Sequence, residues 1–298
     1  MRTPVLLLLA VLLCGCPQQT EIPTPAPPAE LTETIQYQSL PGVDPNLLSL
    51  DVYFDSGEDE VRPVVVYVHG GAWAVGDKAN NISDKVALFR GENYVFVSLN
   101  YRLSPTEMGP NYADRVKFPV HNQDVATAVA WVADNIGRFG GDPQRIALLG
   151  HSAGAHLVSL TGTSPTFLTE TGYATDLLRG VASIDTEGYD VAAQVADGNT
   201  VYVNAFGVDP AENRAASPIY NLSEGRSYPP FFVAQRGSAR RLGIASAFTD
   251  RLRAVGAEVT VLETQTYDHE GINAAIGAAG ETEVTGPLLA FFREVFGE

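Results

Sequence analysis

Cysteine is nearly absent from this 298-residue chain. The two cysteines, Cys14 and Cys16, both lie close to the N-terminus. The sequence after them therefore has no thiol for a disulfide, a cysteine-based zinc site or thiol chemistry. Its folded part must be held by its core alone, and a hydrophobic fraction of 45 % with 18 % charged residues is typical of a globular protein.

Basic residues are also scarce, since 19 Lys and Arg against 35 Asp and Glu give a formal net charge of −16. Such a surface repels phosphate backbones and anionic lipid headgroups, so we expect no nucleic-acid partner and no basic membrane-binding patch. The chain contains no His-Glu-x-x-His, Gly-x-Gly-x-x-Gly or phosphate-loop pattern. We therefore expect neither a metal site nor a cofactor.

The N-terminus has the pattern of a targeting signal. Arg2 precedes an apolar run from Pro4 to Leu13, which is shorter than the roughly 20 residues that span a bilayer and fits the central region of a signal peptide. The following Leu13-Cys14-Gly15-Cys16 resembles a bacterial lipoprotein signal. This resemblance implies that residues 1–15 are removed and that Cys16 is lipidated. An ordinary secretory signal with incidental cysteines is the alternative.

Residues 16–31 are rich in proline, which predicts an extended, semi-rigid tether, and residues 32–298 are long enough for one α/β domain. The lipoprotein resemblance implies attachment to the bacterial cell envelope, facing the periplasm or the exterior. The N-terminal lipid would then be the sole membrane contact. The sequence carries no signal for an oligomeric state.

Strand and helix patterns alternate from residue 32 onward. Continuous apolar runs at 64–68 and 94–99 predict strands buried on both faces. Further strands are expected at 47–54, 145–149, 180–184, 231–234 and 259–262. Helices are expected over 122–138, with Asn122 as the cap, after Ser152, and over 245–255 and 287–296. This alternation predicts an α/β fold with a mostly parallel sheet, helices on both faces, and ligands outside the carboxyl ends of the strands.

The segment Gly150-His151-Ser152-Ala153-Gly154 lies between a predicted strand and a predicted helix. That context favours a nucleophile elbow, in which a serine sits on a strained turn and small neighbours let the chain pass closely. The helix N-terminus behind Ser152 favours developing negative charge. An incidental glycine-rich turn is the alternative.

A second motif, His69-Gly70-Gly71-Ala72-Trp73, directly follows the strand at 64–68. A His-Gly-Gly segment at this point supplies backbone N–H groups for an oxyanion hole in lipases and esterases. We assign Gly70, Gly71 and the N–H of Ala153 to that role. Trp73 and His151 are candidates for the lining of the substrate pocket.

These motifs stand in family order with several others, so that the stretch from Val64 to about Leu160 resembles the α/β-hydrolase superfamily. The similar branch contains bacterial carboxylesterases, hormone-sensitive-lipase-like esterases and kynurenine formamidase-like enzymes. The resemblance implies an α/β-hydrolase fold and an acyl-enzyme on Ser152. The other motifs are Asn100-Tyr101-Arg102-Leu103-Ser104-Pro105, Phe118-Pro119, Asp124, Trp131 and Phe139-Gly140-Gly141-Asp142-Pro143.

A serine hydroxyl needs a base, and in this fold the histidine comes last in chain order. Of the five histidines, His269 alone follows the last predicted strand, which makes it the predicted base. Related esterases carry their acid in a Gly-x-x-Asp context after the strand at 231–234. This chain has Gly237-Ser238-Ala239-Arg240 there, and arginine cannot accept a hydrogen bond from histidine.

We therefore predict that the acid comes from the preceding strand, as Asp185, with Glu187, Asp190 and Asp268 as alternatives. The predicted function is hydrolysis of short-chain or aryl carboxylic esters by a serine esterase, with a small-molecule ester as its substrate. One alternative is an arylformamidase-type amide hydrolase, whose nucleophile segment is similar to residues 150–157. The other is a weak or inactive hydrolase-fold surface lipoprotein, if Arg240 marks a missing acid.

Overall fold

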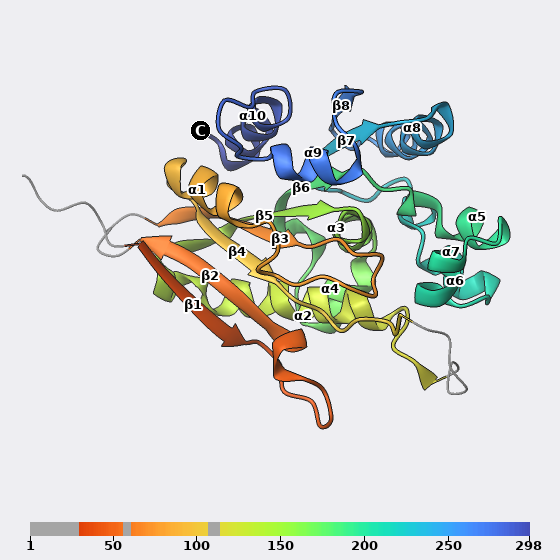
Figure 1. Cartoon of the computed structure of the whole chain (residues 1–298), viewed down its shortest axis with the longest axis horizontal. Coiled ribbons are helices and arrows are strands. Elements are labelled where there is room, and N and C mark those ends of the chain that lie inside the picture. Colours follow the sequence, from red (N-terminus) through yellow and green to blue (C-terminus); the bar gives the residue numbers. More distant parts are fainter. Residues whose placement is uncertain (1–29, 56–60, 107–113) are drawn as a thin grey trace, which may run out of the picture.

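The computed structural model describes residues 30–55, 61–106 and 114–298. Within these residues an eight-stranded sheet runs through the centre, in the order β1-β2-β4-β3-β5-β6-β7-β8 (Figure 1). The strands are β1 (Glu30–Gln36), β2 (Ser49–Asp55), β3 (Arg62–Val68), β4 (Val95–Leu99), β5 (Gly141–His151), β6 (Leu178–Ile184), β7 (Phe231–Arg236) and β8 (Val259–Thr264). The β1–β2 and β2–β4 pairs are antiparallel and the pairs from β4 to β8 are parallel, which confirms the predicted mostly parallel sheet.

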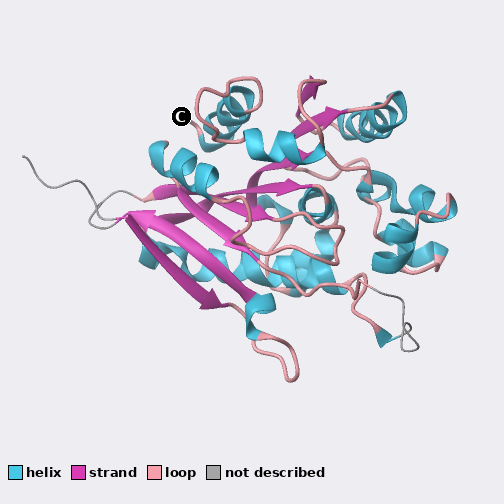
Figure 2. Cartoon of the chain, in the orientation of Figure 1, coloured by secondary structure: helices cyan, strands magenta, loops and turns pink. Residues whose placement is uncertain are grey.

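Helices cover both faces of the sheet, as predicted (Figure 2). The α-helices are α1 (Ser83–Gly91), α2 (Val120–Asn135), α3 (Ala153–Thr163), α4 (Pro165–Glu170), α5 (Val191–Ala196), α6 (Thr200–Phe206), α7 (Pro210–Ala215), α8 (Ala239–Ala254), α9 (His269–Ala275) and α10 (Thr285–Phe296). Short 3₁₀ turns are η1 (Pro45–Leu48), η3 (Ile136–Phe139), η4 (Thr175–Leu177), η5 (Gly188–Asp190) and η6 (Pro218–Asn221).

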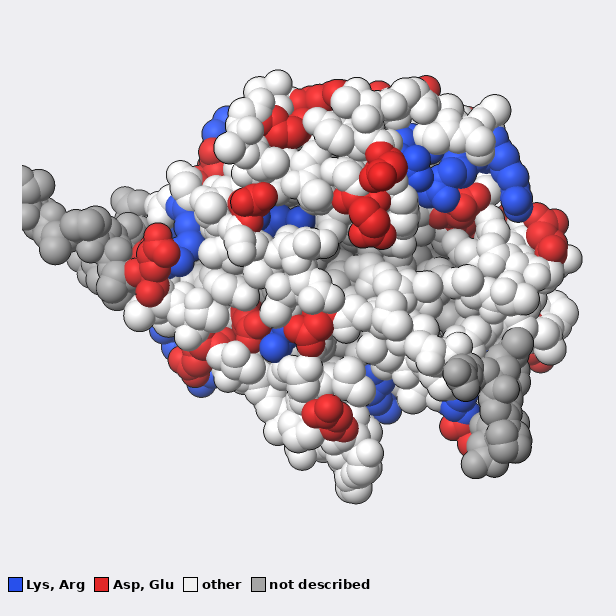
Figure 3. Space-filling model, viewed as in Figure 1, with Lys and Arg blue, Asp and Glu red and all other residues white. Residues whose placement is uncertain are grey.

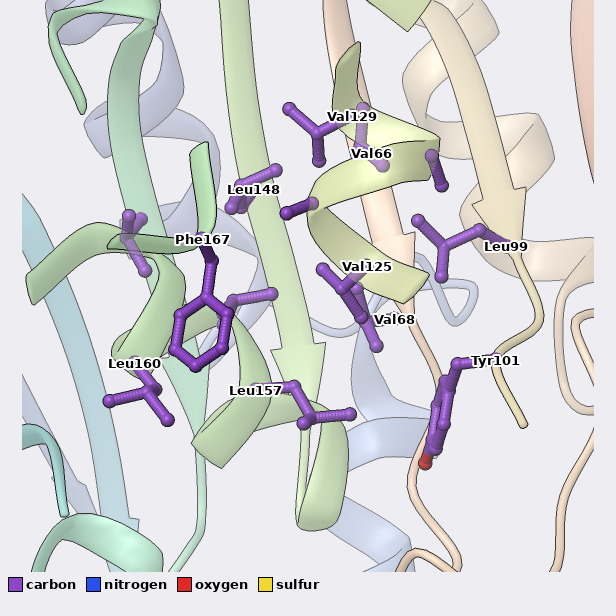
Figure 4. Packing of buried hydrophobic residues seen from close by; sticks show 14 of the residues in the cluster. Val66, Val68, Leu99, Tyr101, Val125, Val129, Leu148, Leu157, Leu160 and Phe167 are labelled. Carbon is purple, nitrogen blue, oxygen red and sulfur yellow. The ribbon is translucent and has the colours of Figure 1, made fainter. Parts of the chain in front are cut away.

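The fully buried run of β3 divides the core into two layers. Val64, Val66 and Val68 face a layer that includes α2 and α3, whereas Val65 and Tyr67 face a layer that includes α1, α9 and α10. Figure 4 shows the first layer, in which aliphatic side chains of the sheet and of α2 and α3 interlock. Because successive side chains of a strand point to opposite faces, this double burial explains why the strand reads as a continuous apolar run.

Two local predictions differ from the structure. Asn122 does not cap its helix, because α2 begins at Val120 after Pro119, and the buried Asn122 amide instead donates to the Leu157 carbonyl at 3.1 Å. The edge strand β1 was not predicted, and its first two residues fall in the segment expected to be the tether. Apart from Ile35 its residues are exposed, so it has no apolar face for a sequence pattern to detect.

The parallel strands bring four loops to one edge of the sheet. The oxyanion motif follows β3, Ser152 follows β5, Asp185 follows β6, and His269 begins α9 after β8. Between β6 and β7 the chain forms α5, α6 and α7, which lie together at the end of the molecule away from β1 (Figure 1). The candidate site therefore lies outside the carboxyl ends of the strands, as predicted for this fold class.

Candidate active site

Ser152 lies on the tight turn between β5 and α3. Its backbone adopts φ 55° and ψ −116°, a region that non-glycine residues rarely enter, and its N–H donates to the Ile184 carbonyl at 3.0 Å. A Cβ on Gly154 would lie 2.0 Å from the Val68 carbonyl oxygen, and a Cβ on Gly150 would lie 2.4 Å from the Gly154 oxygen. Both glycines are therefore required by the close approach of the chain, as the elbow motif predicts.

The three residues of the predicted triad lie together in one chain of hydrogen bonds. His269 Nε2 is 2.8 Å from Ser152 Oγ, and His269 Nδ1 is 2.6 Å from Asp185 Oδ2. The imidazole is about one-third exposed, whereas the Asp185 carboxylate is 3 % exposed. The arrangement sets a hydroxyl, a ring nitrogen and a buried carboxylate in line, which is the geometry that proton transfer from the serine requires.

The other candidate acids have separate partners. Glu187 pairs with Arg241, Asp190 caps α5 through the Ala193 N–H at 3.0 Å, and Asp268 caps α9 through the Gly271 N–H at 2.7 Å. Arg240 points away from the triad and pairs with the exposed Asp197 at 2.6 Å. Of the four carboxylates considered, Asp185 alone lies within hydrogen-bonding distance of His269 among the described residues.

Asp185 is held by cations as well as by His269. Arg236 Nε donates to Oδ2 at 2.7 Å and Arg241 Nη2 donates to Oδ1 at 2.7 Å. Burial on its own would raise the pKa of Asp185, but the hydrogen bonds from His269 and the two arginines outweigh it and lower that pKa to about 2. The carboxylate is therefore ionised at neutral pH, accepts from Nδ1–H, and leaves Nε2 as the basic nitrogen beside Ser152.

The predicted oxyanion segment passes directly beside the serine. A Cβ on Gly70 would lie 3.0 Å from Ser152 Cβ, and Gly71, at φ 111°, has room for no side chain because a Cβ would lie 2.0 Å from the Val75 oxygen. Tyr101 holds this loop in place. Its hydroxyl donates to the His69 carbonyl at 3.2 Å, and the Tyr101 ring stacks on the His69 ring. Asp124 pairs with Arg102 in the loop that follows β4.

A cavity of about 130 Å³ opens beside Ser152. Trp73 lines this cavity, and its ring packs edge-on against Tyr202 and Phe206 of α6. Val201, Tyr202 and Arg241 also line the cavity and were not predicted, because nothing in the motifs indicates that α6 and α8 fold back over the site.

Acidic and basic groups are interspersed over the face of the molecule that Figure 3 shows, and this face is hollowed near its centre.

His151 lines a cavity of about 350 Å³ that neighbours the one beside Ser152, and it is 2 % exposed. Its role in a substrate pocket stays a prediction. Its Nε2 donates to the His269 carbonyl at 2.8 Å, and burial lowers its pKa to about 3, so the ring is neutral. The residue before the serine therefore supports the backbone of the histidine.

In the part of the chain that the structure describes, we find no helix with the length and apolar character of a membrane-spanning segment. The same part of the chain contains no group of three or more His, Cys, Asp or Glu residues arranged to hold a metal ion.

The strand order and the serine elbow define an α/β-hydrolase fold, and comparison with known proteins agrees. A family model described as BD-FAE matches residues 50–185. The chain is 30 % identical over 245 residues to Esterase LipC and 32 % identical over 247 residues to Esterase LipQ, both of Mycobacterium tuberculosis. These matches cover 77 % and 73 % of this chain and 57 % and 52 % of the relatives, so the chain spans about half the length of the curated relatives it matches.

Solved structures show the same fold. Esterase B from Lactobacillus Rhamnosis matches with a TM-score of 0.72 at 20 % identity, covering 90 % of this chain and 86 % of that one. A truncated carbohydrate esterase from gut microbiota matches with a TM-score of 0.72 at 18 % identity, covering 92 % and 100 %. The chain has the α/β-hydrolase fold, and the relatives named here are esterases.

Proposed function

We propose that this protein is a serine hydrolase that cleaves carboxylic esters through an acyl-enzyme. The observation that carries the proposal is the continuous hydrogen-bonded chain from Ser152 Oγ through His269 to the buried Asp185. His269 Nε2 takes the serine proton as Oγ attacks the ester carbonyl, and ionised Asp185 stabilises the imidazolium that forms. His269 then protonates the departing alcohol. In the second half of the reaction, His269 takes a proton from the water that attacks the acyl-enzyme and then returns it to Ser152 Oγ as the acid leaves.

The tetrahedral intermediate carries a negative oxygen that needs hydrogen-bond donors. We assign this role to the backbone N–H groups of Gly70, Gly71 and Ala153, because the glycine loop passes beside Ser152 and Ala153 is the first residue of α3. The relatives named as esterases support the proposed ester hydrolysis. Arg240, the residue that favoured an inactive protein, lies outside the site and pairs with Asp197.

The purified chain from residue 17 onward is expected to hydrolyse p-nitrophenyl acetate, and to lose activity as the acyl chain grows to octanoate. A cavity of about 130 Å³ beside Ser152 has room for a short acyl group, and Trp73 and Tyr202 are among the residues that line it. The assay compares kcat/KM across acetate, butyrate and octanoate esters and includes N-formylkynurenine as the amide substrate. A higher kcat/KM for formylkynurenine would favour the arylformamidase alternative, and inactivity on every ester would contradict the proposal.

We further propose that Cys16 is lipidated and anchors the domain to the bacterial cell envelope, with residues 17–29 as part of the tether. Cys16 and the signal lie outside the described residues, and the proposal rests on the sequence pattern alone. In a bacterial host, Cys16→Ala is expected to lose labelled palmitate and to shift the protein from the membrane fraction to the soluble one. Cys14→Ala is the matched control, since Cys14 precedes the expected cleavage point. Equal labelling of the Cys16→Ala chain would overturn the anchor.

A further inference from the structure

Two arginines lie close in sequence to position 240, where the family resemblance implies the acid of the triad. Arg236 ends β7, and Arg241 lies in the first turn of α8. Both reach back to Asp185 at the end of β6, so the acid comes from one strand and its cationic partners come from the next.

The two arginines bind different oxygens of the Asp185 carboxylate. Arg236 Nε shares Oδ2 with His269 Nδ1, whereas Arg241 Nη2 donates to Oδ1. A carboxylate anchored at Oδ2 alone can still turn about its Cβ–Cγ bond. The contact at Oδ1 therefore fixes the plane in which Oδ2 meets the imidazole.

Arg241 has further contacts on both its guanidinium and its backbone, and space beside its side chain. Its Nη1 pairs with Glu187, which follows β6 two residues after the acid. Ser238 caps α8 and accepts from the Arg241 N–H at 3.4 Å. Gly237, at φ 93°, leaves room for the arginine, because a Cβ there would lie 3.1 Å from Arg241 Cδ.

Helix energetics disfavour this position for an arginine. The N-terminus of a helix carries partial positive charge, which favours acidic residues in the first turn and disfavours basic ones. The first turn of α8 has no acidic residue and contains both Arg240 and Arg241. Arg240 pairs at the surface, but Arg241 is mostly buried and contacts the triad, so its position is explained by Asp185 and not by the helix.

We propose that Arg241 is a positioning residue of the triad, which orients the Asp185 carboxylate so that Oδ2 faces His269 Nδ1. This inference rests on the proposed ester hydrolysis only for its kinetic readout. The inference also predicts that Arg241 matters more than Arg236 for the rate, because loss of Arg236 leaves the contact at Oδ1 intact and loss of Arg241 removes it.

The kinetic test compares Arg241→Gln, Arg241→Lys, Arg236→Gln and Arg240→Gln with the unchanged protein on p-nitrophenyl acetate. Arg241→Gln is expected to lower kcat about 10- to 100-fold through misorientation of the base, with KM changed less than about twofold. Arg241→Lys recovers part of kcat, Arg236→Gln loses less, and the surface variant Arg240→Gln matches the unchanged protein. A loss confined to KM, or equal rates for Arg241→Gln and Arg240→Gln, would overturn the inference.

A second measurement does not depend on activity. The proton between His269 Nδ1 and Asp185 is expected to give a low-field NMR resonance, identified by its disappearance in His269→Gln. Arg241→Gln should shift or broaden this resonance, and Arg240→Gln should leave it in place. An unchanged resonance in Arg241→Gln overturns the positioning role even if the protein hydrolyses no ester, whereas inactivity of the unchanged protein counts against the proposed function alone. Circular dichroism confirms that each variant is folded.

Discussion

Replacing Ser152 with alanine is expected to lower kcat for p-nitrophenyl acetate by about 10⁶-fold, with KM nearly unchanged. The substitution removes the Oγ that lies 2.8 Å from His269 Nε2, so no acyl-enzyme can form. The residual rate comes from water acting with the glycine loop and the remaining base. Steady-state kinetics on the purified protein, with labelling of the serine by a fluorophosphonate probe, measure both consequences.

The matched control is Ser246→Ala. Ser246 is exposed on α8, where its hydroxyl makes a long contact of 3.4 Å with Asp250. This variant should react with the probe and hydrolyse the ester at the rate of the unchanged protein. Equal activity of Ser152→Ala and Ser246→Ala would show that the nucleophile lies elsewhere and would remove the basis of the proposed mechanism.

Asp185→Asn is expected to lower kcat by about 10⁴-fold, the size of effect that follows when an amide replaces the acid of such a triad. The amide group can donate an N–H to His269 Nδ1. The imidazole then carries its own proton on Nε2, and Nε2 cannot accept the proton of Ser152. The substitution also leaves Arg236 and Arg241 without the carboxylate that both contact. We therefore expect a lower denaturation midpoint as well, because each arginine loses a charged partner in a largely buried site.

Asp268→Asn tests whether the neighbouring carboxylate has any share in this effect. Asp268 caps α9, and asparagine caps a helix as well as aspartate does. Its kcat should stay within about twofold of the unchanged protein. If Asp268→Asn lost as much activity as Asp185→Asn, the acid would be misassigned, whatever the hydrogen bond at His269 suggests.

The two motifs around the nucleophile were predictable because their requirements are local. Gly150 and Gly154 flank Ser152 at two positions where a Cβ would clash with the backbone. Gly71 adopts a positive φ in a loop that has no room for a side chain. Such constraints act on consecutive residues, so they leave a pattern that is legible without coordinates. The strand runs at 64–68 and 94–99 were predictable for a similar reason, since burial on both faces demands an unbroken apolar run.

The acid and its partners depend on distances between chain segments. Four carboxylates lie in loops that follow strands or precede helices: Asp185, Glu187, Asp190 and Asp268. The sequence favoured Asp185 as the acid but left the other three as alternatives. The choice follows from the parallel register of β6 and β7 and from the start of α9, which put His269 against Asp185 across 84 positions of the chain. Arg241 and Tyr202 joined the site for the same reason and had no motif to mark them.

The chain alone thus specified a nucleophile and a turn rich in glycine, because the backbone imposes each of these at a single place. It also specified the base, because His269 alone among the histidines follows the last predicted strand. Which carboxylate completes the triad, which arginine holds it and which helix closes the cavity were set by packing, since strand pairing and helix docking bring together groups that no local pattern connects. The missed edge strand β1 and the interior place of Asn122 have the same origin: an exposed edge leaves no apolar signal, and a helix start depends on the chain that enters it.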